Sequence, residues 1–307
     1  MRCDLHVHSK CSGAADLPLL RHLSRESYSE PLDIYWTELQ RGMDLVTITD
    51  HDTIEGALQI AHLPHVFISE EVTCRLPTGT ELHLGVFDID DRRHSRIQAI
   101  CDDAEALFAY LAEEDLPFCV NHPFSPLTGR REASDLPFAF GHARSVEALN
   151  GMMPAASNEG ARAAARVAGL PAVGGSDAHT LASAGRAYTE VPGARTREEF
   201  LAGLRAGHTI PRGRSGSYAR LTGDVARVFV GALRENGAHA FDSVSDLARF
   251  LGVAALTPVM GVMPLLTVFN YASEVFLAGA HHRRYRTSPR QLRPIERPVP
   301  VRAAGAA

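Results

Sequence analysis

The chain has 307 residues and a formal net charge of −5, with 45% hydrophobic and 22% charged residues. These values are typical of a globular protein that is long enough for one large domain and an appendage. The charge weighs against a partner that is a nucleic-acid polymer, because no excess of Lys and Arg can neutralise its phosphates. The five cysteines follow no disulfide or metal-binding spacing, and no basic-then-apolar leader follows Met1. Both features favour a cytoplasmic protein with reduced thiols.

From the N-terminus, short apolar runs that predict β-strands alternate with amphipathic segments that predict helices. The predicted strands cover residues 2–8, 45–49, 66–69, 81–86, 117–120, 146–149, 171–174 and 188–191. The predicted helices cover residues 31–41, 95–114, 158–167 and 196–206. This alternation predicts an α/β protein of the barrel type, in which functional residues lie at the carboxyl ends of the strands.

The sequence changes character near residue 216, where the alternation of strands and helices stops. An amphipathic helix is predicted over 217–235, and Ser243 with Asp246 resembles a capping box that begins a second helix. The last twenty residues are rich in Arg and Pro, which predicts disorder. The predicted regions are a barrel over 1–215, an apolar α-helical appendage over 216–284 and a tail over 285–307.

Residues 250–273 carry no charge and are long enough to cross a bilayer. Pro258 and Pro264 each remove a helix hydrogen bond that lipid cannot replace. We therefore expect a broken helical segment that packs on the barrel or on a partner subunit. Two alternatives stay open: self-association or membrane-surface contact through 217–280, and membrane association of the cytoplasmic protein through 250–273.

The most informative feature is an ordered series of histidines and acids at or near the ends of predicted strands. Its members are His6, His8, Asp50, His51, Glu71, His83, His122, Asp177 and His179. His6 and His8 fall on one face of a strand, so both imidazoles can reach one cation. Glu70 and Glu71 point to opposite faces, so at most one of them is expected at the site. Imidazole and carboxylate donors that converge on one mouth predict a polynuclear site for Mn, Fe or Zn, in preference to Mg or Ca.

The motifs DLHVHSK, TITDHDT, SEEVT, HLGVF, NHP and GGSDAH resemble the PHP family (polymerase and histidinol phosphatase) over about residues 2–213. The stretches HVHSK, ESYSEPLDIY and GRAYTEV are most similar to PHP modules that are fused to glycosyltransferases or lie beside them. The resemblance implies a metal-dependent phosphoesterase on a distorted seven-stranded (β/α) barrel, similar to a TIM barrel. It also implies a small phosphorylated substrate, and a glycosyltransferase as a neighbour.

The resemblance further implies two to three divalent metal ions. The first would be held by His6, His8, Glu71 and Asp177, the second by Glu71, His83 and His122, and the third by His51, His179 and one further ligand. In many relatives that ligand is an Asp or His five residues after the second His of the HxH motif. This chain has Gly13 at that position, and Asp16 or Cys11 are the substitutes that we consider.

The expected reaction is the hydrolysis of a phosphate ester. Two neighbouring cations would lower the pKa of a bridging water and clamp the phosphate oxygens, so that a metal-bound hydroxide attacks phosphorus. The candidates for protonating the leaving group are His51, His179 and Asp50. The candidates for contacting the substrate phosphate are Arg130, Arg131 and Arg186, although arginines in loops are more often only solvated.

Two other functions stay open. An amidohydrolase-like C–N hydrolase would use similar metal chemistry, but such sites usually contain a carboxylated lysine, and the only lysine in the barrel, Lys10, is poorly placed. A degenerate or accessory metal-binding module of a glycosyltransferase or cell-envelope system would explain Gly13 and the apolar C-terminal region. The intact series of ligands argues against this module and favours a phosphoesterase that acts on a nucleotide or a sugar phosphate.

Overall fold

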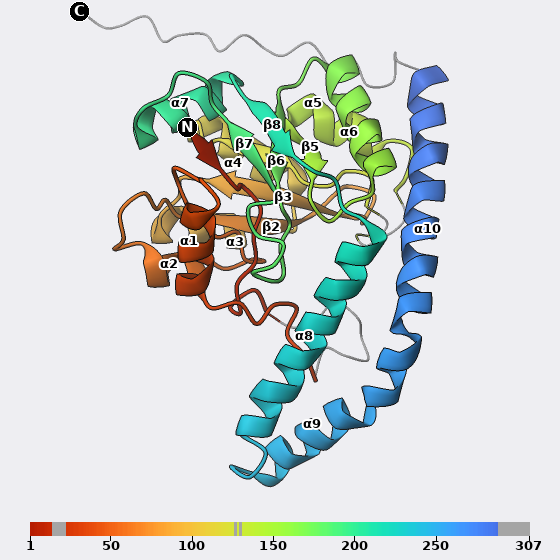
Figure 1. The fold of residues 1–307 in the computed structure, drawn as a ribbon. Coiled ribbons are helices and arrows are strands. Elements are labelled where there is room, and N and C mark those ends of the chain that lie inside the picture. Colours follow the sequence, from red (N-terminus) through yellow and green to blue (C-terminus); the bar gives the residue numbers. More distant parts are fainter. Residues whose placement is uncertain (14–22, 126–127, 129–130, 288–307) are drawn as a thin grey trace, which may run out of the picture.

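The computed structural model describes residues 1–13, 23–125, 128 and 131–287, and they form an α/β protein with two sheets and a helical arm (Figure 1). The larger sheet has the order β2-β3-β4-β5-β6 and the smaller one the order β1-β7-β8. β3 is antiparallel to β2 and β4, whereas β4, β5 and β6 are parallel. The strands are β1 (Arg2–Cys3), β2 (Ser69–Arg75), β3 (Glu81–Phe87), β4 (Phe118–Val120), β5 (Ser145–Asn150), β6 (Ala172–Gly175), β7 (Ala187–Glu190) and β8 (Ile210–Gly213).

Seven helices accompany these strands in the described part of the chain up to residue 213. They are α1 (Pro31–Gln40), α2 (Glu55–Ile60), α3 (Asp91–Gln98), α4 (Ala104–Glu113), α5 (Asp135–His142), α6 (Ala155–Ala168) and α7 (Arg197–Ala206). The predicted single helix over 95–114 is wrong. Asp90 and Asp103 each accept a hydrogen bond from a backbone N–H three residues later, so each caps a separate helix. The short elements α2, α5 and β8 were not predicted.

The predicted strands over 2–8 and 45–49 are largely replaced by extended segments between the two sheets. Single parallel bridges join Val7 to Ala178, Val46 to Val66 and His51 to Glu71. A closed seven-stranded barrel is therefore not assigned among the described residues, because the ladders form two separate sheets.

Side chains take over the backbone hydrogen bonds that a continuous ladder would use. Thr49 Oγ1 accepts from Val7 N at 2.9 Å, and Thr189 Oγ1 accepts from Gly174 N at 2.8 Å. The carboxylate of Asp4 accepts from the backbone N–H groups of His6 and Ser176 at 3.1 and 2.8 Å. Side-chain bonds of this kind offer the backbone an alternative to strand pairing.

The C-terminal arm consists of α8 (Tyr218–Ala238), α9 (Val244–Ala255) and α10 (Thr257–Thr287). Ser243 caps α9, as the sequence predicts, and Ser217 caps α8. The predicted break occurs beside Pro258, because α9 ends at Ala255 and α10 begins at Thr257 with Pro258 in its first turn. No break occurs at Pro264, where α10 continues. Within the described residues, one stretch of this helix, Thr257–Phe276, has the length and composition of a membrane span, and 11% of it is buried.

The division of the chain into the three predicted regions stays a prediction. Most of the predicted tail over 285–307 lies outside the described residues.

Candidate metal centre

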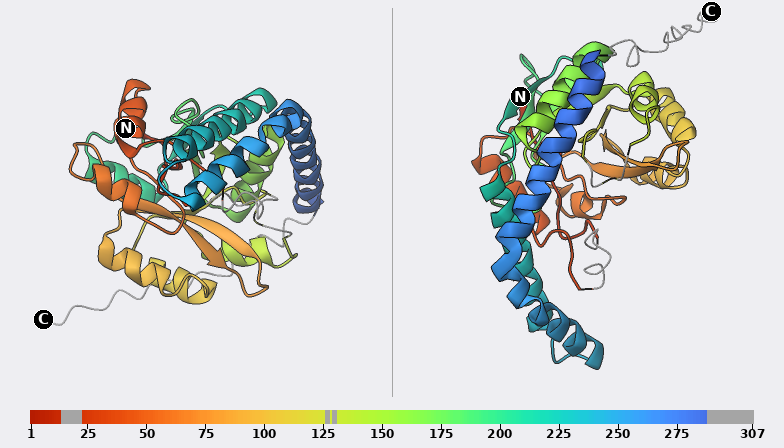
Figure 2. Two further views of the ribbon diagram at one scale, coloured as in Figure 1. Left: turned by 90° about the horizontal axis from the view of Figure 1, so that it is seen from below. Right: turned by 90° about the vertical axis from the view of Figure 1, so that its right-hand side faces the viewer.

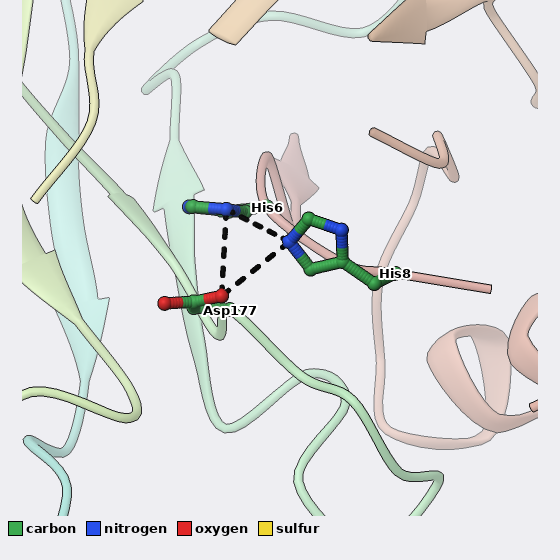
Figure 3. A group of neighbouring side chains, drawn as sticks. All are labelled: His6, His8 and Asp177. Atoms are coloured by element: carbon green, nitrogen blue, oxygen red, sulfur yellow. Dashed lines mark hydrogen bonds and ion pairs between the residues drawn. The ribbon is translucent and has the colours of Figure 1, made fainter. Parts of the chain in front are cut away.

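The first predicted set of ligands converges at the end of β6. His6 Nε2 lies 3.1 Å from His8 Nε2, 3.0 Å from Glu71 Oε2 and 3.5 Å from Asp177 Oδ1. His8 Nε2 lies 3.3 Å from the same Glu71 oxygen. It also lies 3.4 Å from the same Asp177 oxygen, and Figure 3 shows His6, His8 and Asp177 together. Four ligands about 2.1 Å from a tetrahedral cation would lie about 3.4 Å from one another. These donor atoms therefore have the spacing of one coordination shell.

The other oxygen of Glu71 faces the second set. Glu71 Oε1 lies 3.1 Å from His122 Nε2 and 3.4 Å from His83 Nδ1, and it accepts a hydrogen bond from Asn121 Nδ2 at 2.9 Å. Among the described residues, His83 Nδ1 is buried without a hydrogen-bond partner, which is costly unless another atom binds it. Because its two oxygens face different ligand sets, Glu71 is placed to bridge two cations.

The third set is completed by Glu26, which the sequence analysis missed. Glu26 Oε2 lies 3.9 Å from Nε2 of both His51 and His179, and Glu26 Oε1 lies 3.6 Å from His8 Nδ1. The backbone N–H of Glu26 donates to Gly13 O at 3.4 Å, so the chain returns to the position where the expected ligand is missing. A carboxylate is therefore present in this set although position 13 offers none.

Neither Cys11 nor Asp16, the substitutes that we considered for Gly13, is seen as a ligand of the third set. Cys11 Sγ is paired with Gln59 Nε2 at 3.3 Å, and Asp16 lies outside the described residues. Glu26 follows no predicted strand, and the available signal was its place as the first residue of the stretch ESYSEPLDIY.

A second carboxylate that we missed, Glu147, orients the ligands from behind. Its Oε1 is 2.9 Å from His6 Nδ1, and its Oε2 accepts from the backbone N–H of His122 at 2.9 Å. Asn150 Nδ2 donates to both Glu147 and Asp177 at 3.0 Å. Such partners fix the ring orientation and leave Nε2 of His6 to face a cation. A buried acid in the middle of the apolar strand SVEALN was the available signal.

The backbone is also adapted to this arrangement. His122 and Asp177 adopt positive φ angles of 24° and 53°, which are uncommon for residues other than glycine. Gly175 lets β6 approach closely, since a Cβ atom there would lie 2.3 Å from His6 Cβ. Strained backbone of this kind tends to gather at functional sites.

The electrostatics of the cluster show how strongly it attracts positive charge. Burial favours the neutral acid of Asp177, yet His6 and His8 hold its pKa well below the usual range. Burial also lowers the pKa of His8, but hydrogen bonds to Asp177 and Glu71 outweigh this effect and raise it to about 10. Protons on imidazoles thus balance the carboxylates in the protein alone. Divalent cations would take over that role and release the protons.

His51 and His179 behave differently from His8. Burial lowers the pKa of both imidazoles, with the neighbouring His8 adding to the effect for each. They are therefore neutral near pH 7, which is the form that binds metal. This charge state favours a role as ligands over a role as proton donors.

Asp50 is bound to the loop that follows His8. Its carboxylate accepts from Ser9 N and Ser9 Oγ, both at 2.6 Å, and the side chain is buried. This pairing fixes the turn after the HxH motif, and the predicted proton-donor role of Asp50 stays a prediction. Glu70, as expected, points away from the ligands and pairs with His94 at 2.9 Å.

The structure places neither Arg131 nor Arg186 in the cluster of ligands. Arg131 is buried and donates to Glu81 O and to Thr128 Oγ1. Arg186 is exposed and donates to Ala182 O at 3.2 Å, whereas Arg130 lies outside the described residues. Contact of these side chains with a substrate stays a prediction.

Comparison with known proteins agrees with the motifs and the ligand geometry. A family model described as PHP-associated matches residues 155–209, which include β6 and the ligands Asp177 and His179. This segment of the chain therefore resembles the PHP-associated family. The family and the groups of His and Glu side chains together support the use of divalent metal ions.

Individual relatives of the chain are distant. Uncharacterized protein MJ1587 of Methanocaldococcus jannaschii is 36% identical over 72 residues, which are 24% of the chain and 41% of that protein. The chain therefore spans less than half the length of this curated relative.

Two solved structures also resemble the chain. PsfC from Pseudomonas syringae PB-5123 has a TM-score of 0.49 and 17% identity, over 76% of this chain and 98% of PsfC. A candidate metal-dependent phosphoesterase from Bifidobacterium adolescentis has a TM-score of 0.40 and 15% identity, over 58% and 88% of the respective chains. At these scores neither structure adds to the functional argument.

Proposed function

We propose that this protein is a metal-dependent phosphoesterase of the PHP family that hydrolyses a phosphate ester of the nucleotide or sugar phosphate class. The observation that carries the proposal is the bridging position of Glu71 between two sets of imidazoles, with Asp177 completing the first set. Mixed nitrogen and oxygen donors of this kind suit Mn, Fe or Zn.

Bound cations would supply Lewis acidity and a lowered pKa for water at the mouth of the site. The chain contributes the arrangement that this chemistry needs. Glu71 would hold two cations at a short separation, and Glu147 and Asn150 keep His6 and Asp177 in place. The neutral imidazoles of His51 and His179, with Glu26, would hold a third cation.

We also propose that the extended segments on either side of the centre belong to a distorted seven-stranded barrel. Backbone hydrogen bonds run from Asp177 N to His6 O, from Thr49 N to Val7 O and from Glu71 N to Asp50 O. These bonds connect β6 to β2 through residues 4–9 and 45–51. They support a closed arrangement with the centre at one end of it.

A phosphate-release assay tests the activity. The full chain is reconstituted with Mn, Fe or Zn and incubated with nucleotides, sugar phosphates and an aryl phosphate. We expect Asp177→Asn to lower turnover by about a hundredfold or more, because it removes an anionic ligand at nearly constant volume. Asp102→Asn, at an exposed aspartate, is the matched control and should keep wild-type turnover.

The alternatives predict other results. Hydrolysis of amides but not of phosphate esters would favour an amidohydrolase-like enzyme. Bound metal without turnover of any tested phosphate would favour an accessory module and contradict the proposal.

A further inference from the structure

Helix α10 has its polar and apolar sides reversed relative to a helix of a soluble protein. Thr267 and Glu274 face the interior and are each 5% exposed, whereas Leu265 and Phe269 are 70% and 75% exposed. A surface helix normally buries its apolar side and shows its polar side to water. The exposed side of α10 is therefore shaped for an apolar environment.

Hydrogen bonds fix this orientation of the helix. Thr267 Oγ1 lies 2.7 Å from Thr222 Oγ1 on α8, and Tyr218 OH donates to Pro264 O at 2.9 Å. Asn270 Nδ2 donates to Glu274 Oε1 at 3.3 Å on the inner side. Rotating the helix to bury its apolar side would break the two hydrogen bonds that join α10 to α8, so the apolar side stays outward.

The outward side forms a continuous apolar strip that we call the α10 strip. It contains Val259, Val262, Leu265, Leu266, Val268, Phe269, Val275 and Phe276. No member carries a charge or a side-chain hydrogen-bonding group. At 1.5 Å per residue the strip is about 26 Å long.

We propose that the α10 strip embeds in the surface of a lipid bilayer, with the helix axis parallel to the membrane. A protein partner of this size would normally offer and require about one hydrogen bond per 100–200 Å² of interface, and the strip provides no side chain for one. Hydrocarbon requires none. An apolar strip of this length matches helices that lie at the boundary between headgroups and acyl chains.

The packing of α10 argues against a membrane-spanning orientation. α10 packs along α6 on the outside of the molecule (Figure 2). α6 exposes Glu159, Arg162 and Arg166, and charged groups of this kind are costly inside hydrocarbon. A helix that lies in the membrane plane keeps α6 in water, while a spanning helix would have to leave it.

The charge of the following sequence fits a membrane with anionic lipids. The sequence of α10 continues with His281, His282, Arg283, Arg284 and Arg286, after a stretch whose only charged residue is the inward-facing Glu274. Anionic headgroups attract basic residues that lie next to an apolar membrane-contacting segment.

Vesicle flotation tests the proposal with the full chain. Wild-type protein should float with vesicles of phosphatidylcholine and phosphatidylglycerol, and the double variant Leu265→Glu, Phe269→Glu should lose about tenfold or more of its bound fraction. The matched control Leu32→Glu, Leu58→Glu changes exposed apolar residues elsewhere and should float like the wild type. Unchanged circular dichroism would show that the variants are folded.

A second experiment measures the orientation. The chain has one tryptophan, so Trp36→Phe provides a background for Val259→Trp, Leu266→Trp or Phe276→Trp. Lipids brominated at different depths should quench all three fluorophores equally and at shallow depth. Deep quenching confined to Leu266→Trp would mean a spanning helix. A wild-type protein that does not float would overturn lipid binding. The same holds if the wild type does not float but forms a dimer in solution and the glutamate variant is monomeric, because the strip would then bind a second copy of the chain.

Discussion

Glu26 shows how one residue can supply a ligand that a motif lacks. It lies outside the HxH motif, yet its carboxylate lies within 4 Å of the imidazoles of His8, His51 and His179. The geometry tolerates this replacement because a cation requires only a donor atom at the right place.

Glu26→Gln should therefore lower the number of bound Mn ions by about one per chain, because the amide keeps the volume but loses the charge. We expect turnover to fall roughly tenfold as well. Elemental analysis measures the metal content. Glu30→Gln is the control, since Glu30 is exposed and pairs with Lys10 at 2.7 Å. Equal metal content in both variants would contradict the assignment of Glu26.

At the level of residues, sequence reasoning brought together the ligands that follow strands and missed those that do not. His6, His8 and Asp177 converge as expected, since strand ends meet at one edge of a sheet. Glu26 follows no predicted strand, and its position depends on a loop contact with Gly13 that no periodicity encodes. Glu147 was readable only as an unexplained charge in an apolar strand.

At the level of elements, the pKa of Glu274 on α10 depends on the metal centre through Asp177. Burial raises its pKa from 4.5 to about 7, and Asp177 adds to the rise. Between these values the folded chain holds a proton that the unfolded chain has lost, so the free energy of unfolding falls as pH rises through this window. A change of this size is worth at most about 3 kcal/mol.

Glu274→Gln should abolish that fall in stability. Denaturant unfolding at about pH 5 and about pH 7 measures the free energy of unfolding of the metal-free wild type and variant. All other titrating groups are the same in the two proteins, so a difference between them in pH dependence reports on Glu274. The wild type should lose more stability than the variant across this interval. An equal loss in the two proteins would show that Glu274 does not carry a raised pKa.

Element prediction succeeded where local signals agreed and failed where two signals competed. Pro31 begins α1, and Ser243 begins α9, as their capping signals indicate. The continuous apolar spacing over 95–114 concealed Asp103, whose carboxylate accepts from Ala106 N and starts a new helix. In α10 the effect of Pro264 was overestimated, because a helix can continue through one missing hydrogen bond.

At the level of the whole molecule, metal binding should be coupled to folding. The buried carboxylates of Glu71, Asp177 and Glu147 sit among imidazoles, and cations that bind only the folded chain would stabilise it. Free Mn at a hundredfold excess over its Kd should add about 2.7 kcal/mol. Differential scanning calorimetry with Mn and with a chelator measures this change, and Asp177→Asn should show a smaller one. A melting temperature that Mn does not alter would contradict the coupling.

The overall architecture was predicted more coarsely than the site. The order of strands and helices follows from hydrophobic periodicity, which is a local property. The division into two sheets does not, since it depends on side chains such as Thr49 and Asp4 that take backbone hydrogen bonds across large sequence separations. Only the folded structure shows which side chain or strand accepts each backbone hydrogen bond.

The metal content of the reconstituted full chain tests the metal centre most directly. The protein is stripped with a chelator, loaded with Mn, freed of excess metal and measured by elemental analysis. We expect about two to three ions per chain, because four overlapping groups of donor atoms share His6, His8, His51 and Glu71 among them. Anomalous diffraction should place these ions between the same side chains. Less than about one ion per chain, after loading with Mn, Fe or Zn, would contradict the assignment of these residues as a metal centre.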